Sequence, residues 1–282
     1  MTICVAVKVH DCLVLAADSA TSLVGADAEN RSAIINVYAH GNKVFNLVKG
    51  LPIAAMTCGM GNIGRSSISS LAKEIRRQLS QPLQDGGIDP DKYTMEEIAN
   101  RAKKILFDDN YARLEEIPAG EHSLEFIIGG YGANCDDAEV WKVVIANGDC
   151  AGPFQQMEGA DSFVLWSGQP EALNRLILGY SHGVIDALIE GGLEPDRVAG
   201  VEALIREKTG TSLVSPPMPT GDAIALADFL VDVTKRYVHF LDGADTVGGD
   251  TDIATVTRYE GFKWIKRKHF YPRELNRETD HV

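Results

Sequence analysis

The order of the predicted elements constrains the fold of this chain more than any other feature. Four short β-rich stretches come first and predict two hairpins, at 3–9 with 12–17 and at 43–48 with 52–57. Helical periodicity then covers 68–79, and Thr94 with Glu97 forms a capping box that predicts a second helix directly afterwards. Two helices in succession do not fit β-α-β alternation, so this pattern argues against a parallel, doubly wound sheet.

The rest of the chain keeps strands and helices in separate groups. Strand-like stretches are 124–131, 140–146, 162–167, 253–259 and 262–268, and helix-like stretches are 171–190, 197–207 and 221–241. The polar stretch 23–32 predicts an exposed loop, and Ser215-Pro216-Pro217 separates two of the helices. This order predicts an α+β fold in which two antiparallel sheets pack together with helical layers outside. We expect one domain over residues 2–282.

Composition and charge exclude several classes of protein. Of the 282 residues, 45% are apolar and 24% are charged, as in ordinary globular proteins. No apolar run approaches the ~18 residues of a membrane span, and the N-terminus lacks the features of a secretory signal, so we expect a cytoplasmic protein. The net charge of −13 argues against nucleic acid or an anionic membrane as the main partner. The five cysteines form no CxxC pair, which predicts reduced thiols.

Thr2 is a candidate nucleophile because it follows the initiator methionine and leads into an apolar strand. If Met1 is removed, a hydroxyl and a free α-amine lie on the same residue. An α-amine has a reference pKa near ~8, so it can act as the local base for the hydroxyl. Many proteins begin with Met-Thr, and the assignment therefore depends on the residues that surround Thr2 in the fold.

Two charged residues are predicted to lie near Thr2. The hairpin formed by the first two strands returns to Asp18, close to the start of the first strand, and Lys43 opens the third strand. A lysine lowers the local cost of negative charge beside a reactive hydroxyl, and an aspartate keeps that lysine charged and in place. Taken alone, Asp18 would be an ordinary aspartate at the end of a strand, and Lys43 would be an ordinary surface lysine.

The segment TICVAVKVHDCLVLAADSAT resembles the opening of proteasome β subunits and related bacterial peptidases, including the ancestral-β-subunit group. In these N-terminal-nucleophile (Ntn) hydrolases, the mature chain begins with the catalytic threonine, and a hairpin leads to an aspartate. Thr2 and Asp18 match that spacing. GNKVF resembles the family segment with the catalytic lysine, here Lys43, after an insertion of about nine residues. The resemblance implies a four-layer αββα sandwich and a threonine peptidase.

Later segments extend the resemblance over nearly the whole chain. AAMTCGMGNIG resembles the turn whose backbone N–H forms the oxyanion hole, which implies this role for Gly59. LWSGQPEAL resembles the motif with an auxiliary serine, which implies Ser167, and DTVGGDTDIATV resembles the loop with an auxiliary aspartate, which implies Asp245. The spacing around Asp245 is one residue short, and the family's serine in that loop has no clear match. The residues expected to line the substrate pocket are Thr21, Phe45 and Met56.

The resemblance also implies a reaction and partners. Thr2 would attack an amide or peptide carbonyl while its own α-amine takes the hydroxyl proton, and no cofactor is needed. The expected partners are a peptide or other amide substrate, further copies of the chain in a ring or related homo-oligomer, and an unfolding ATPase. The seven histidines are scattered without an HExxH pair, so nothing predicts a catalytic metal.

Two other functions stay open on the sequence. The chain could be a catalytically silent proteasome-like subunit with a structural or binding role, which would keep Met1. It could also bind a nucleotide, because Gly59 to Gly64 is a literal G-x-G-x-x-G between a strand and a helix. The second parallel strand that a dinucleotide site requires is not predicted, which favours the turn interpretation over this one.

Overall fold

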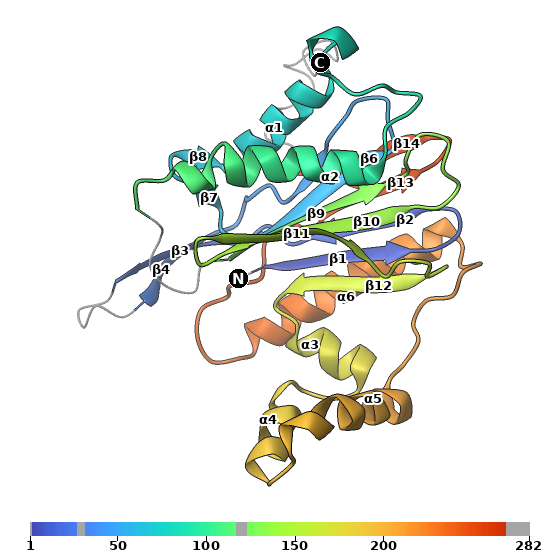
Figure 1. Cartoon of the computed structure of the whole chain (residues 1–282). Helices are drawn as coiled ribbons and strands as arrows, with labels where there is room; N and C mark the ends of the chain where they lie inside the picture. The colour runs from blue at the N-terminus through green and yellow to red at the C-terminus, as the bar shows by residue number, and fades with distance from the viewer. Residues whose placement is uncertain (1, 27–31, 117–122, 269–282) are drawn as a thin grey trace.

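The computed structural model describes residues 2–26, 32–116 and 123–268, and two five-stranded sheets form its centre (Figure 1). Sheet 1 has the order β12-β1-β2-β13-β14, and sheet 2 has the order β11-β10-β9-β6-β5. The strands of sheet 1 are β1 (Ile3–Lys8), β2 (Leu13–Ala17), β12 (Phe163–Gly168), β13 (Asp252–Thr257) and β14 (Gly261–Lys266). Those of sheet 2 are β5 (Val44–Asn46), β6 (Ile53–Gly59), β9 (Ser123–Gly130), β10 (Glu139–Ala146) and β11 (Asp149–Gln156). All neighbouring strands within both sheets pair antiparallel.

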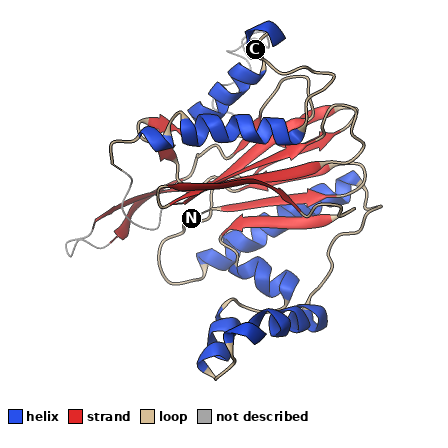
Figure 2. Cartoon of the chain, in the orientation of Figure 1, coloured by secondary structure: helices blue, strands red, loops and turns tan. Residues whose placement is uncertain are grey.

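Helices lie on the outer side of each sheet (Figure 2). The helices α1 (Ile68–Leu79) and α2 (Met95–Lys103) pack on sheet 2, and α6 (Thr220–His239) packs on sheet 1. Further helices are α3 (Glu171–Leu173), α4 (Gly183–Glu190) and α5 (Val198–Thr209). Short 3-10 or π turns cover Leu83–Asp85, Lys104–Asp108, Tyr111–Arg113, Asn174–Leu178 and Pro195–Arg197. The chain is therefore a mixed α+β fold with antiparallel sheets and helices, as the order of elements predicted.

The apolar sequence of β1 follows from its position between two cores. Ile3 and Val5 face the core that α6 covers, whereas Cys4 and Ala6 face the core between the sheets. Successive side chains of a strand point to opposite faces, so a strand that is buried on both faces must be apolar throughout. The third core lies between sheet 2 and the helices α1 and α2, where Ile75 is fully buried.

Hydroxyl side chains cap the first two helices, and the Thr94 cap was predicted. The Ser67 hydroxyl accepts a hydrogen bond from the Ser70 N–H (3.1 Å) at the start of α1, and the Thr94 hydroxyl accepts one from the Glu97 N–H (3.0 Å) at the start of α2. The second half of the predicted capping box does not form, because the Glu97 carboxylate pairs with Arg101 instead (2.7 Å). A side-chain cap of this kind contributes about 1 kcal/mol.

The prediction of a loop over residues 23–32 was wrong for residues 23–26 and 32, which belong to strands. The strands β3 (Thr21–Ala26) and β4 (Ser32–Tyr38) form an antiparallel hairpin that extends away from the two sheets (Figure 1), and residues 27–31 lie outside the described part of the chain. Val24 pairs with Ile34 across the hairpin. These β-branched residues favour strands, and the polar residues between them masked the pattern. A small two-stranded pair, β7 (Asn62–Ile63) with β8 (Ser66–Ser67), precedes α1.

Two further predictions need correction. The helix predicted over 171–190 is divided, because the first part ends at Gly179, whose φ is +82°, and α4 starts only at Gly183. An αL residue ends a helix, and glycine adopts that conformation most readily. The strand β11 was not predicted, because Gly152 and Pro153 interrupt its pattern. Pro153 is tolerated there because β11 lies at the edge of sheet 2.

No helix within the described part of the chain combines the length and apolar character that crossing a bilayer requires.

Candidate active site

The carboxylate of Asp18 is the centre of the polar residues at the end of β2, and it is fully buried. Its Oδ1 accepts hydrogen bonds from the Ile3 N–H (3.0 Å) and the Lys43 ammonium (2.6 Å). Its Oδ2 accepts from the N–H groups of Ala20 and Gly248, each at 3.0 Å. Four donors therefore satisfy the hydrogen-bonding capacity of both oxygens of this buried carboxylate.

The fold brings Asp18 and Lys43 together from different sheets. Cys4 pairs with Ala17 in the β1–β2 hairpin, so Asp18 arrives opposite Ile3, and the Asp18 N–H donates to the Ile3 carbonyl (3.2 Å). Lys43 immediately precedes β5 in sheet 2, where its own carbonyl accepts from the Thr57 N–H (2.9 Å). Its ammonium then crosses to sheet 1, and the residue is only 6% exposed. The predicted neighbourhood of Asp18 and Lys43 is therefore present.

Thr2 immediately precedes β1, next to the residue whose N–H bonds to Asp18, and is 4% exposed. Its carbonyl accepts a hydrogen bond from the Gln169 N–H (2.7 Å). Gly168 allows this close approach, because a Cβ at that position would lie 2.0 Å from the Thr2 oxygen, and its φ is +103°. Ile3, the residue after Thr2, shares Asp18 Oδ1 with Lys43. Met1, whose removal was predicted, lies outside the described residues.

Ser167 belongs to a second polar group that also joins the two sheets. It pairs with Cys4 on β1, and its hydroxyl accepts a hydrogen bond from the Lys142 ammonium (2.9 Å). Lys142 on β10 also pairs with Glu125 on β9 (2.7 Å). The sequence reasoning missed Lys142 and Glu125. Two charged residues within otherwise apolar strands were the available signal, because such residues are rarely buried unless they are paired.

Two buried thiols lie among these charges. The Cys4 thiol donates to the Thr57 carbonyl (3.2 Å). Burial, followed by the nearby Cys58, raises the pKa of Cys4 well above its ordinary value, and burial, followed by Glu125, raises the pKa of Cys58 to about 12. A thiol reacts as its thiolate, so both groups stay protonated and unreactive at neutral pH.

Gly59 is the last residue of β6, it is exposed, and its φ is +93°. A Cβ at this position would lie 1.9 Å from the Ser123 carbonyl oxygen, which accepts a hydrogen bond from the Met60 N–H (2.8 Å). Glycine is therefore required by the turn itself. The strand before this turn pairs antiparallel on both sides, with β5 and β9. A dinucleotide fingerprint needs a parallel β-α-β unit, so this arrangement does not support a nucleotide site at Gly59–Gly64.

The structure places Asp245 apart from the contacts of Asp18. Its side chain is 56% exposed and lies 3.0 Å from His239 Nδ1. It lines a cavity of about 550 Å³ together with Phe240 and Val37. From the same loop it is the backbone of Gly248 that reaches Asp18, because its N–H donates to the carboxylate and its carbonyl accepts from Ser19 and Ala20.

The three residues expected to line a substrate pocket do not lie together. Met56 is fully buried in the core between the sheets. Phe45 faces the opposite side of sheet 2, where it stacks on Phe126 with ring centroids 6.5 Å apart. Thr21 is partly exposed at the start of β3, near Gly61 and Gly41. Val44 pairs with Met56, so Phe45, the next residue of β5, must point to the other face.

A second buried ion pair, between Lys268 and Asp252, lies behind Asp18 and was also missed from the sequence. The Lys268 ammonium donates to the Ser19 hydroxyl (2.6 Å), and that hydroxyl bonds to the Asp250 carbonyl. The Lys268 N–H donates to Asp252 Oδ1 (3.1 Å). The Lys268 ammonium thus holds Ser19, the residue after Asp18, and supports the end of β2.

The described residues contain no cluster of metal ligands. No group of three or more His, Cys, Asp or Glu side chains among them is placed to hold a metal ion, and this includes the acidic loop around Asp245.

Comparison with known proteins gives a result for the fold alone. No family model matches the sequence, and no curated protein matches it. Among solved structures, the chain is similar to a proteasome-like protein. This structure is the Gly-1 mutant of Anbu from Hyphomicrobium sp. strain MC1, which is 15% identical with a TM-score of 0.52, over 100% of this chain and 90% of that chain. The likeness shows that the two chains share a fold.

Proposed function

We propose that the chain is a threonine-type Ntn hydrolase that cleaves amide or peptide bonds with Thr2 as its nucleophile, once Met1 has been removed. The observation that carries this proposal is the buried Asp18–Lys43 pair, in which the Lys43 ammonium (2.6 Å) and the Ile3 N–H (3.0 Å) share one carboxylate oxygen directly beside Thr2. We also propose that the two sheets and their outer helices are the four-layer αββα sandwich of Ntn hydrolases, formed as one domain over residues 2–282.

The proposed reaction has two steps. The Thr2 hydroxyl attacks the carbonyl carbon of the substrate, while the α-amine of Thr2, directly or through water, takes the hydroxyl proton. The N–H of Gly59 stabilises the negative oxygen that develops. The C–N bond then breaks, the leaving amine takes the proton, and an ester to Thr2 remains. Water hydrolyses this ester and restores the threonine.

The charged groups around Thr2 would set the electrostatics of this reaction. Lys43 would stabilise negative charge near the hydroxyl. Its ammonium is buried in the protein interior, where the interaction between two charges is stronger than in water. Asp18 would hold that ammonium in place. Ser167, bonded to Lys142, would orient the α-amine. Asp245 would act only after a rearrangement of its loop, because its carboxylate contacts His239 in this structure.

The shared fold with the proteasome-like protein Anbu supports a proteasome-like relationship. On that basis we propose a homo-oligomer, such as a ring, that encloses the sites, and an unfolding ATPase as a further partner in the cytoplasm. Substrates would be peptides or other amides.

The test combines intact-mass analysis with amide hydrolysis. We expect the natural protein to lack Met1 and to hydrolyse members of a panel of fluorogenic peptide amides. Thr2→Ala should lower the rate by about three orders of magnitude, because the nucleophile is lost. Thr2→Ser is the matched control, since it keeps both the hydroxyl and the α-amine, and it should retain activity. Retention of Met1, or an active Thr2→Ala variant, would disprove the proposed mechanism.

One observation favours a second candidate, a catalytically silent proteasome-like subunit. The Asp245 carboxylate, expected to be part of the catalytic machinery, contacts His239 and is not among the partners of Asp18, so this part of the expected site is not assembled. This candidate predicts that Met1 is retained and that the panel of peptide amides is not hydrolysed, while the chain still assembles with its partners.

A further inference from the structure

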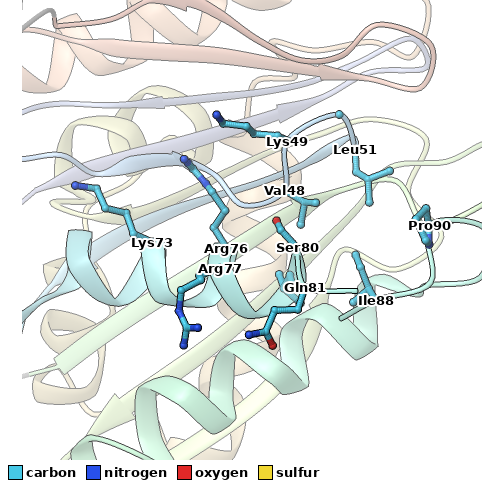
Figure 3. Close-up of a pocket in the computed structure, with 12 residues that line it drawn as sticks. Val48, Lys49, Leu51, Lys73, Arg76, Arg77, Ser80, Gln81, Ile88 and Pro90 are labelled. Atoms are coloured by element: carbon cyan, nitrogen blue, oxygen red, sulfur yellow. The ribbon is translucent and has the colours of Figure 1, made fainter. Parts of the chain in front are cut away.

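A cavity of about 600 Å³ lies away from Thr2, between the second half of α1, the turn that joins β5 to β6, and the segment that leads to α2 (Figure 3). Its charged lining residues are Lys49, Lys73, Arg76 and Arg77, and no carboxylate is among the described residues that line it. This arrangement is unusual in a chain with a formal net charge of −13. A gathering of positive charge in a concave site attracts anions.

Arg76 is the cation whose environment most needs explanation. It is half-buried, and its Nε donates to the Asn46 carbonyl (2.8 Å), as does its Nη2. A carbonyl is neutral, and no carboxylate in the described part of the chain forms an ion pair with Arg76. Burial, followed by the nearby Arg267, lowers the pKa of its guanidinium. A guanidinium has five N–H donors, so most of its donors remain for a ligand.

A simpler explanation accounts for part of this cluster. Cations near the C-terminus of a helix interact favourably with its dipole, and Arg76 and Arg77 lie in the last turn of α1. Arg77 fits that explanation, because it points to the opposite side from Arg76 in Figure 3 and pairs with Glu74 (2.6 Å). Lys73 does not fit. It lies a turn earlier, repels Arg76 at i,i+3 spacing, and has no ion-pair partner among the described residues.

The opposite end of the cavity is apolar. The apolar residues that line the cavity are Val48, Leu51, Leu79, Ile88 and Pro90. In Figure 3, Lys73 and Arg76 extend from α1 toward the side where Lys49 lies, whereas Leu51, Ile88 and Pro90 lie beyond the end of the helix. The cavity thus has a cationic end and an apolar end, and its volume is within the usual range of small-molecule sites.

We propose that this cavity binds an organic phosphate, with the phosphate group at Arg76 and Lys73 and the apolar part of the molecule against Leu51 and Ile88. Two cations suit a phosphate, which carries up to two negative charges, better than a singly charged carboxylate. The planar fork of Arg76 can bond two phosphate oxygens at once. This binding function is separate from the proposed hydrolysis at Thr2.

The test uses phenyl phosphate as the probe, with calorimetry on the full chain. We expect phenyl phosphate to bind and its affinity to fall as salt is added. Inorganic phosphate and phenol should each bind about tenfold more weakly, because each occupies only one end of the cavity. Benzoate, which carries one charge, should also bind more weakly. If benzoate or inorganic phosphate binds as well as phenyl phosphate, the proposed ligand class is wrong.

Three variants locate the binding site. Arg76→Gln should weaken phenyl phosphate binding by about tenfold, and Lys73→Gln by a smaller factor of about threefold. Arg175→Gln is the matched control and should leave binding unchanged, because Arg175 does not line the cavity and is paired with Glu171 (2.7 Å). Arg76 also donates to the Asn46 carbonyl, so Arg76→Gln could lower the stability of the fold. Thermal melting of each variant checks that it is folded. Lys73→Gln tests the site without removing that contact. Binding that is insensitive to both Arg76→Gln and Lys73→Gln would overturn the proposal, whereas binding that persists in Thr2→Ala would show its independence from hydrolysis.

Discussion

Removing the carboxylate of Asp18 would leave the ammonium of Lys43 buried without a counter-charge. The ion pair is almost completely excluded from solvent, and three backbone N–H groups complete the coordination of the carboxylate. Taking two charges out of water is costly, so a buried pair adds little net stability when it is intact. Breaking it is costly, because the remaining charge is neither hydrated nor paired.

We therefore predict that Asp18→Asn lowers the free energy of unfolding by about 3–5 kcal/mol. Asp245→Asn is the control, because Asp245 is 56% exposed and its loss should change the free energy by no more than about 0.5 kcal/mol. Urea unfolding of both variants measures the difference. Equal stabilities for the two variants would contradict the buried coordination of Asp18.

The five cysteines should differ sharply in reactivity. Cys4, Cys12 and Cys58 are buried, and burial raises the pKa of each thiol, to about 12 for Cys58. A thiol stays protonated while the pH is below its pKa. Raising the pH from 7 to 9 should therefore not make these three thiols reactive toward a thiol reagent. Cys135 is exposed and should react first in the native protein.

A titration with a chromogenic disulfide reagent measures this order. Cys135→Ser should remove the fast phase, and denaturant should release the three buried thiols together. Rapid modification of Cys58 in the native Cys135→Ser variant would show that the space between the sheets is open to reagents.

At the scale of elements, the contact between the end of β12 and the start of β1 fixes the position of Thr2. Gly168 has a φ of +103°, and a Cβ there would lie 2.0 Å from the Thr2 carbonyl oxygen. Gly86 has a similar φ of +90°, but a Cβ added there would meet no atom within 4 Å. The two glycines share the same backbone strain and differ only in the close approach.

We predict that Gly86→Ala costs only the roughly 1–2 kcal/mol of left-handed backbone strain. Gly168→Ala should cost clearly more, because β1 and β12 must separate, and it should also displace Thr2 and reduce any hydrolysis. Thermal unfolding and peptide-amide assays of both variants give the comparison. A Gly168→Ala variant as stable as Gly86→Ala would mean that the strand ends can separate at little cost.

Elements with local signals were predictable from the sequence, and long-range partners were not. The β1–β2 hairpin, α1 and the cap of α2 follow from local periodicity and Thr94, and Asp18 follows from the hairpin geometry. The Lys142 bond to Ser167 and the Lys268 bond to Ser19 join residues 25 and 249 positions apart. The packing of the two sheets brings the first pair together, and the pairing of β2, β13 and β14 within sheet 1 brings the second pair together. The strand β3 was missed because the polar residues after it obscured its alternation.

At the scale of the whole molecule, the positions of the three apolar cores show which apolar residues are core residues and which could line a pocket, a distinction that the sequence could not make. Met56 was expected to line a substrate pocket, yet it lies fully buried between the sheets. A side chain in such a core contributes to stability, whereas a pocket residue contributes to substrate affinity.

Met56→Ala should therefore lower the free energy of unfolding by about 2–5 kcal/mol. Leu83→Ala, at a leucine that is 61% exposed, is the control and should change it by no more than about 0.5 kcal/mol. Denaturant unfolding measures both values. If Met56→Ala is as stable as the control but alters peptide selectivity, Met56 lines a pocket after all.

The coordination of Asp18 has a consequence for when the protein can become active. Its four donors come from Ile3, Ala20, Lys43 and Gly248, so the set spans most of the length of the chain. During synthesis, the ribosome adds Ile3, Ala20 and Lys43 long before it adds Gly248. A nascent or truncated chain that ends before Gly248 therefore cannot complete the charge network beside Thr2. For the proposed hydrolase, completion of folding would therefore be required before Thr2 could act as a nucleophile.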